Sequence, residues 1–138
     1  MKTYLDIADN DYLFFCDIDE TKPHNFNNYC ATAQSICEKY LKHLVNEYCR
    51  PENDGEEKLR QDALRTHSIR KLYTYIKRAI PSCSMDFTSI LKSDGYYFSA
   101  RYPGDNYFDT TEEDVENCKN AVKSCKVEVE KFIMRINS

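Results

Sequence analysis

Residues 25–49 read NFNNYCATAQSICEKYLKHLVNEYC and decide the fold. Apolar side chains recur there every three or four positions for about six turns, which is the period of an amphipathic α-helix and excludes a strand. They are Phe26, Tyr29, Cys30, Ala33, Ile36, Cys37, Tyr40, Leu41, Leu44, Val45 and Tyr48. Pro23 lies just upstream and the polar segment RPENDGEE follows at 50–57. We therefore expect a long helix over 25–49, followed by a loop.

Four further segments show the same helical period. The expected helices lie at about 3–19, at 69–79 before Pro81, at 86–102 before Pro103, and from Thr110 or Thr111 to the C-terminus. Asp86 is a candidate N-cap of the 86–102 helix. Because short connections favour neighbours that run in opposite directions, the sequence predicts an all-α, antiparallel up-and-down bundle of about five helices.

Length and composition favour one domain over 1–138, because 138 residues suffice for a single core. Only three glycines and four prolines argue against an all-β design. No apolar run is long enough to span a membrane, and Asp6, Asp9 and Asp11 interrupt any signal peptide. The expected localisation is therefore cytoplasmic, where thiols stay reduced.

The seven cysteines are an odd number, so they cannot all pair within one chain. Cys30 and Cys37 lie seven positions apart, as do Cys118 and Cys125. On a helix this spacing is too long for a disulfide and differs from the C-x-x-C step of zinc sites. We expect small apolar core residues, no metal and no cofactor.

Charge is distributed unevenly along the chain, whose net charge is −4. Residues 1–20 contain one lysine and six acids, whereas residues 58–80 contain one acid, Asp62, and seven cations. The cations are Lys58, Arg60, Arg65, Arg70, Lys71, Lys77 and Arg78. Two interpretations remain open: a site for nucleic acid or another anion, or a solvated face that pairs with the acids of the first helix. Tyr73 and Tyr75 interleave with the cations and would suit base stacking.

Two segments offer candidate site residues. His67 stands at the start of the basic helix in LRTHSIRKLYTYIK, where it could cap or pack, or contact a phosphate. Arg101 and Tyr102 belong to GYYFSARYPGDNYF at 95–108, an aromatic stretch that suits either packing or stacking. A guanidinium there could bond backbone carbonyls or bind a phosphate bidentately. Three glycines are too few for a glycine-rich phosphate loop.

The order of these pieces resembles the HEPN family, helical nucleotide-associated domains of prokaryotes and higher eukaryotes. The matching stretches are IADNDYLFFCDI with Ala8 and Asp11, CATAQSICEKYLKHLV with Gln34, Glu38 and Lys42, THSIRKL, and SARYPGDNYFDTTEEDVENCKNAV. The resemblance implies a bundle that often forms homodimers and is frequently partnered with a small nucleotidyltransferase, in some cases as a toxin–antitoxin pair.

Some members of this family are toxin ribonucleases. These carry an arginine that is followed a few residues later by a histidine, near the last long helices. Here no histidine follows Arg101, so the signature is missing from its expected place. Arg60 and His67 have a compatible spacing, but they lie at the start of the basic helix. Losing the imidazole removes a proton carrier worth about a hundredfold or more in rate.

The resulting hypothesis is a noncatalytic HEPN-like module that binds nucleotide or RNA, a nucleotidyltransferase partner, or both, as a homodimer. Its expected binding residues are His67, Arg70, Lys71, Arg101 and Tyr102. The alternatives are a metal-independent ribonuclease that uses Arg60 and His67, and a purely structural dimeric interaction domain.

Overall fold

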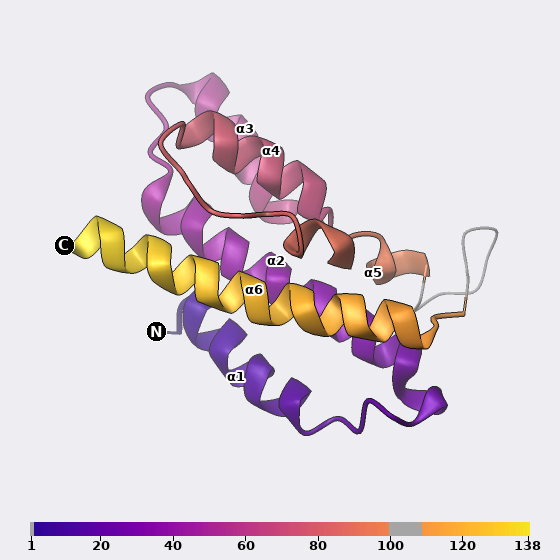
Figure 1. Cartoon of the computed structure of the whole chain (residues 1–138). Coiled ribbons are helices and arrows are strands. Elements are labelled where there is room, and N and C mark those ends of the chain that lie inside the picture. Colours follow the sequence, from indigo (N-terminus) through magenta and orange to yellow (C-terminus); the bar gives the residue numbers. More distant parts are fainter. Residues whose placement is uncertain (1, 100–108) are drawn as a thin grey trace.

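A computed structural model describes residues 2–99 and 109–138 (Figure 1). Its helices are α1 (Tyr4–Cys16), α2 (Phe26–Tyr48), α3 (Asp54–Arg65), α4 (Ile69–Ala79), α5 (Tyr96–Ser99) and α6 (Glu112–Asn137), with short 3-10 turns at Pro23–Asn25 and Ile90–Ser93. No strand occurs in these described ranges. Successive helices alternate in direction, so the predicted all-α up-and-down bundle is confirmed.

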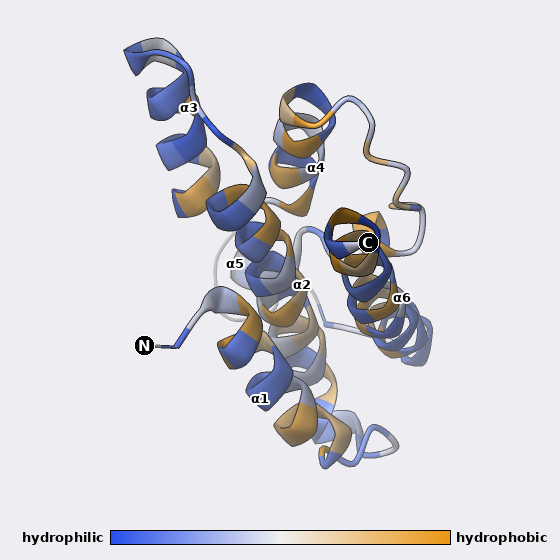
Figure 2. Cartoon of the chain, turned by 90° about the vertical axis from the view of Figure 1, so that its left-hand side faces the viewer, coloured by the Kyte–Doolittle hydropathy of each residue, from blue (hydrophilic) through white to orange (hydrophobic). Residues whose placement is uncertain are grey.

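Helix α2 is the centre of the bundle and contacts every other helix. Figure 2 shows the hydrophobic faces of α2, α4 and α6 turned toward one another, while α3 carries mostly hydrophilic residues. Tyr40, Leu41 and Leu44 of α2 are completely buried, as the sequence pattern predicts. The closest partner of α2 is α6, and the two run side by side in the same direction (Figure 1).

The cysteines on these two helices form part of that interface. Cys30, Cys37, Cys118 and Cys125 are completely buried free thiols, which confirms their prediction as core residues. Cys118 contacts Cys30, and the contact together with burial raises the pKa of the Cys118 thiol. One step of seven residues further along, the Cys125 thiol lies 3.9 Å from the carbonyl oxygen of Cys37. Equal spacing on two parallel helices therefore places the cysteines opposite each other.

Both long terminal helices start with a capping box. The Thr111 hydroxyl accepts from the Asp114 amide at the start of α6, and the Asp114 carboxylate accepts from the Thr111 amide. Thr3 and Asp6 make the same reciprocal pair at the start of α1. Each pair satisfies two amides that the helix itself cannot bond.

Helix α3 corrects one expectation, since 50–57 was predicted as a loop. The helix begins at Asp54 because the Asn53 side chain accepts from the Glu56 amide over 2.9 Å. Acids in its first turn also suit the positive end of the helix dipole; they are Asp54, Glu56 and Glu57. Gly55 lies inside this turn and does not end it.

The expected helix over 86–102 is also wrong for most of its described part, in which only α5 (Tyr96–Ser99) is α-helical. Asp86 caps only its own turn, by accepting from the Thr88 amide over 2.9 Å. A 3-10 turn at Ile90–Ser93 follows, and Gly95 then adopts φ = +94°, a left-handed value that breaks the helical path. The last three positions of the prediction, 100–102, lie outside the described residues.

The described helices include none with both the length and the apolar character that a membrane crossing requires.

Candidate functional site

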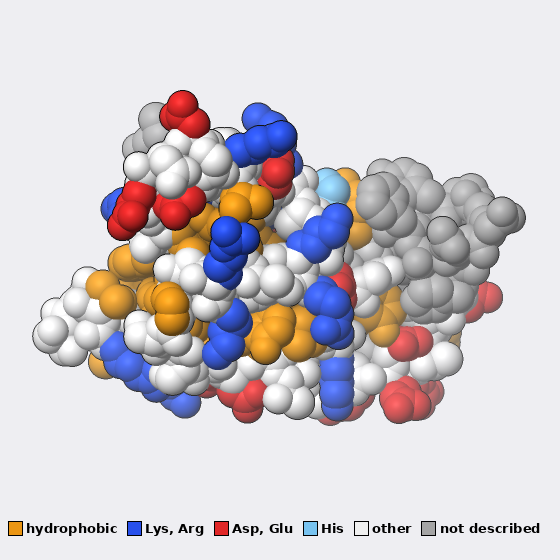
Figure 3. All heavy atoms as spheres, turned by 90° about the horizontal axis from the view of Figure 1, so that it is seen from above, with side chains coloured by type: hydrophobic (Ala, Val, Ile, Leu, Met, Phe, Trp, Pro, Cys, Tyr) orange, Lys and Arg blue, Asp and Glu red, His pale blue; other side chains and the backbone are white. Residues whose placement is uncertain are grey.

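A groove of about 580 Å³ runs between α3 and α4. Its basic side chains are those of Arg65, Arg70, Lys71 and Arg78, and Asp62 is the single acid among the lining residues. Leu59, Ala63 and Tyr75 are its apolar and aromatic lining residues, and Thr66 and Thr74 complete the lining. Figure 3 shows Lys and Arg side chains on this face, with hydrophobic surface between them.

A smaller pocket of about 220 Å³ continues the groove toward the start of α3. Leu59, Tyr75 and Arg78 line both spaces. The remaining lining residues of the smaller pocket are Arg50, Pro51, Glu52, Glu56 and Ala79. The two spaces therefore adjoin, and together they are called the channel, with a basic half and a half of balanced charge.

The acids of the N-terminal segment do not neutralise this face. Asp11 pairs with Lys39 of α2, Asp9 lies 3.2 Å from Lys126 of α6, and Glu20 lies 2.8 Å from Lys119. Asp9 also accepts from the Tyr40 hydroxyl over 2.6 Å. These carboxylates thus attach the N-terminal segment to α2 and α6. The pairing of the basic helix with the first helix, one of the two interpretations of the sequence, is not observed in the described residues.

Two of the seven cations of residues 58–80 have protein partners instead. Arg60 donates to the carbonyl and side-chain oxygens of Asn46 over 3.1 and 2.9 Å and pairs with Glu57. Lys77 donates to the carbonyl of Cys83 over 3.1 Å. Within the described ranges, the side chains of the four basic residues that line the groove make no hydrogen bond or ion pair: Arg65, Arg70, Lys71 and Arg78. These four side chains are solvent-exposed.

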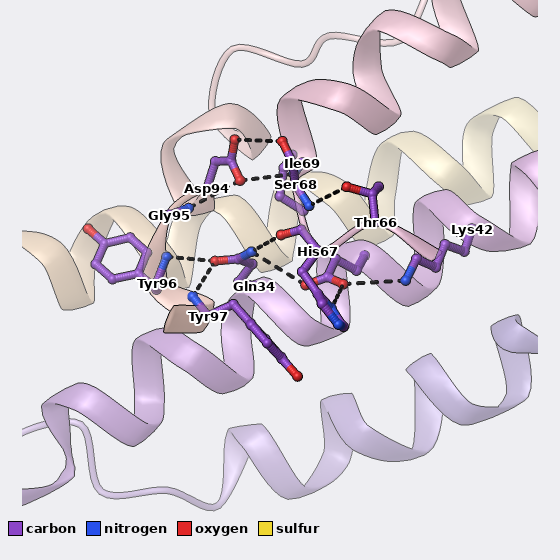
Figure 4. A network of polar contacts seen from close by, with 11 residues as sticks. Gln34, Lys42, Thr66, His67, Ser68, Ile69, Asp94, Gly95, Tyr96 and Tyr97 are labelled. Carbon is purple, nitrogen blue, oxygen red and sulfur yellow. Dashed lines mark hydrogen bonds and ion pairs between the residues drawn. The ribbon is translucent and has the colours of Figure 1, made fainter. Parts of the chain in front are cut away.

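The start of α4 is already capped, so its backbone amides are not available to an anion. The Asp94 carboxylate accepts from the amides of Ile69 and Arg70 over 2.9 and 3.1 Å, and the Ser68 hydroxyl accepts from the Lys71 amide over 3.1 Å (Figure 4). An anion in the groove would consequently be held by side chains. Asp94 fixes the backbone from which Arg70 and Lys71 extend.

The fully buried side chain of Gln34 ties three segments together (Figure 4). Its oxygen accepts from the amides of Tyr96 and Tyr97 over 2.6 and 2.8 Å, and its nitrogen donates to the carbonyl of His67. A central residue of α2 thereby holds both the start of α5 and the turn before α4. This network positions the rim of the groove.

Glu38 lies one turn further along α2 and holds the ring of His67. Its carboxylate accepts from Nδ1 of His67 over 3.0 Å and lies 3.5 Å from the Lys42 ammonium. The ring of His67 also stacks face to face on Tyr97, with ring centroids 3.8 Å apart and planes at 7°. The row Gln34, Glu38 and Lys42 is thus a buried polar stripe on an otherwise apolar helix.

The structure separates the predicted site residues. Arg70 and Lys71 line the groove, whereas His67 points toward Glu38 and does not line it. Arg101 and Tyr102 lie outside the described residues. Composition indicates the basic region but not which of its cations are exposed. Arg65, Arg78 and Arg50, which also line the channel, were therefore not among the predicted site residues.

The two interleaved tyrosines also differ. Tyr73 packs edge-on against Phe87 with ring centroids 4.7 Å apart, and so belongs to the core side of α4. Tyr75 lines both halves of the channel, and partial burial raises the pKa of its hydroxyl. No sequence signal would have identified Asp94, whose partners lie about two dozen residues away.

Arg60 and His67 do not converge on one point within the chain. Arg60 is held by Asn46, and His67 is held by Glu38. These α2 residues are eight positions apart, about 12 Å along the helix axis. In the described part of the chain, no group of three or more His, Cys, Asp or Glu side chains is placed to hold a metal ion.

Comparison with known proteins identifies the family. The HEPN domain model matches residues 57–131, which is more than half of the chain and includes most of α3, all of α4, and α6 up to Lys131. Searches of curated proteins and of solved structures found no match. The match contains the basic half of the channel and agrees with the helical architecture. The chain belongs to the HEPN domain family.

Proposed function

We propose that this protein is a noncatalytic HEPN module that binds a nucleotide, free or within a short RNA, in the groove between α3 and α4. The observation that carries the proposal is the group of four exposed, unpaired cations around one acid in a concave surface. Three of the four are arginines, whose planar guanidinium groups match phosphate oxygens bidentately.

The apolar and aromatic part of the groove lining favours a nucleotide over a simple inorganic anion. Leu59 and Tyr75 offer apolar and aromatic surface beside the cations. Base stacking on an aromatic side chain combined with phosphate neutralisation is the usual way in which proteins hold single-stranded nucleic acid. Because the cations are solvent-exposed, binding should weaken as the salt concentration rises.

The absence of catalysis is proposed from the placement of the histidine. Among the described lining residues of the channel there is no imidazole. The guanidinium of Arg60 is held by Asn46 and Glu57. The arginine that the ribonuclease alternative requires is therefore already engaged within the protein. Binding therefore has better support than RNA cleavage.

Titration of ATP, and of a single-stranded RNA of about eight nucleotides, tests the proposal at two salt concentrations. We expect the double variant R70Q/K71Q to lose at least about tenfold in affinity, since it removes two charge-assisted contacts. Lys58→Gln is the matched control, because Lys58 is an exposed cation of α3 that lines neither half of the channel. Equal losses in both variants, or no binding by either ligand, would contradict the proposal.

Incubation of the same RNA with wild-type protein and with His67→Ala in a chelator tests the ribonuclease alternative. The expected result is intact RNA in both samples. Chelator-resistant cleavage that disappears with His67→Ala would overturn the noncatalytic assignment.

An interaction function is the second candidate, supported by exposed apolar side chains away from the groove. Leu13 and Phe14 of α1 are 65% and 69% exposed, and Met134 of α6 is 72% exposed. A second copy of the chain, or a nucleotidyltransferase as in a toxin–antitoxin pair, is the proposed partner. Sedimentation analysis of wild type and of L13S/F14S tests homodimerisation: a dimer that the variant dissociates supports it, and a wild-type monomer opposes it.

A further inference from the structure

We infer that the channel binds a nucleoside polyphosphate in one orientation, with its phosphates in the larger groove and a base that carries an amino group in the smaller pocket. This inference rests on the proposed nucleotide-binding function. It adds the class of ligand and its direction.

Charge sets the direction. The larger groove has four cations, Arg65, Arg70, Lys71 and Arg78, against Asp62, which leaves it three charges positive. The smaller pocket has Arg50 and Arg78 against Glu52 and Glu56, which balance. Phosphates carry the ligand's negative charge and therefore favour the larger groove, while the two glutamates repel them from the smaller pocket.

The smaller pocket has the chemistry of a nucleoside site. Most of its lining surface is polar; Pro51, Leu59 and Ala79 add a smaller apolar surface against which a ring can lie, and Tyr75 provides an aromatic edge or face. Ionised carboxylates only accept hydrogen bonds, so they select groups that donate. One oxygen of Glu56 accepts from the Glu52 amide over 2.8 Å, and its other oxygen, together with the Glu52 carboxylate, has no hydrogen-bond partner among the described residues. Adenine, guanine and cytosine offer exocyclic amino donors there, whereas uracil has only its ring N3–H to donate.

The residues shared by both spaces connect the two ends of the ligand. Tyr75 and Arg78 lie one turn apart on α4, so their side chains reach the same stretch of the channel. The ribose and the first phosphate would pass this point. From Arg70 to Ala79, α4 rises by about 13 Å, a length that suits a nucleoside with a short phosphate chain.

Calorimetric titration with ATP, AMP, UTP and inorganic tripolyphosphate at one salt concentration tests the inference. We expect ATP to bind most tightly. AMP should lose about tenfold or more through its missing phosphates. Tripolyphosphate and UTP should each bind at least about fivefold more weakly than ATP: tripolyphosphate leaves the smaller pocket empty, and uracil would cover the two carboxylates without giving them an amino donor.

Two variants locate the ends of the ligand. Ala79→Leu fills the smaller pocket at an exposed helix position, and it should reduce ATP affinity to that of tripolyphosphate without changing tripolyphosphate binding. R70Q/K71Q should weaken ATP and tripolyphosphate together, and Lys58→Gln should change neither. Thermal unfolding of each variant verifies that the fold is retained.

The failures are distinguishable. If tripolyphosphate or UTP binds as tightly as ATP, or if the short RNA binds more tightly than ATP, the inference is overturned while phosphate binding in the groove stands. If no phosphate compound binds, the proposed function fails as well.

Discussion

The buried carboxylate of Glu38 holds the imidazole of His67 at 3.0 Å and at the same time faces the ammonium of Lys42. Glu38 and Lys42 are an ion pair one helical turn apart in the interior of the protein. Such a pair contributes little while it is intact, but removing one partner leaves a buried charge without compensation.

Glu38→Ala should therefore lower the free energy of unfolding by about 3 kcal/mol or more, measured by urea denaturation. Glu130→Ala is the matched control, because Lys126 and Glu130 form the same (i, i+4) pair on the surface of α6, where the loss should stay below about 1 kcal/mol. Comparable losses in the two variants would show that Glu38 is not a buried charge in solution.

Asp94 caps α4 from a distant segment, and its removal should cost about 1–2 kcal/mol of unfolding free energy. Hydrogen exchange at the amides of Ile69 and Arg70 should accelerate in Asp94→Ala. Asp86→Ala should have a much smaller effect, since its carboxylate bonds only to Thr88, within its own turn. Unchanged exchange in Asp94→Ala would refute the capping role.

Gly95 has a positive φ, and an added Cβ would meet no atom within 4 Å. The cost of Gly95→Ala is then backbone strain alone, about 1 kcal/mol by thermal or urea unfolding. Gly95→Asn should cost less, because asparagine tolerates the left-handed region better than alanine. A stabilising alanine would mean that the turn has another conformation.

His43 is buried in α2, and its Nδ1 atom has no hydrogen-bond partner among the residues that the structure describes. Burial lowers the pKa of His43, although the carboxylates of Glu47, Asp6 and Asp9 oppose the shift. Since the folded state then binds fewer protons than the unfolded state, stability should fall as the pH decreases through the unfolded value of about 6.5.

Unfolding free energies of wild type and His43→Gln between pH 7.5 and 5 measure this contribution. The variant should show a shallower decline toward acid. Carboxylates whose pKa is lowered, such as Asp6 and Asp114, lose their contributions at more acidic pH and do not interfere. Parallel curves would exclude His43 as a source of acid sensitivity.

The fold could be predicted where one apolar stripe decides an entire helix. Helices α2 and α6 each bury a continuous apolar stripe. Thr111, the N-cap of α6, directly precedes the acids of the first turn in the sequence. Helix α3 was missed because Pro51 and Gly55 read as loop residues, although the Asn53 side chain caps a helix there. The prediction of one helix over 86–102 was wrong because the Asp94 side chain hydrogen-bonds to α4 and Gly95 turns the chain.

The site was predictable only as a region. The local excess of positive charge indicated Arg70 and Lys71, because the charge of an exposed cation does not depend on how the core packs. The partners of His67 and Gln34 are brought together by tertiary packing over 29 and up to 63 positions, and no local pattern encodes such contacts.

The side-by-side packing of α2 and α6 also bears on synthesis. Cys37 meets Cys125 across 88 positions of sequence, so α2 cannot bury its main apolar face until the 26-residue helix α6 has left the ribosome. Contacts this distant slow folding compared with bundles built from local hairpins. A nascent polypeptide that stalls before α6 would expose this face and be prone to aggregate.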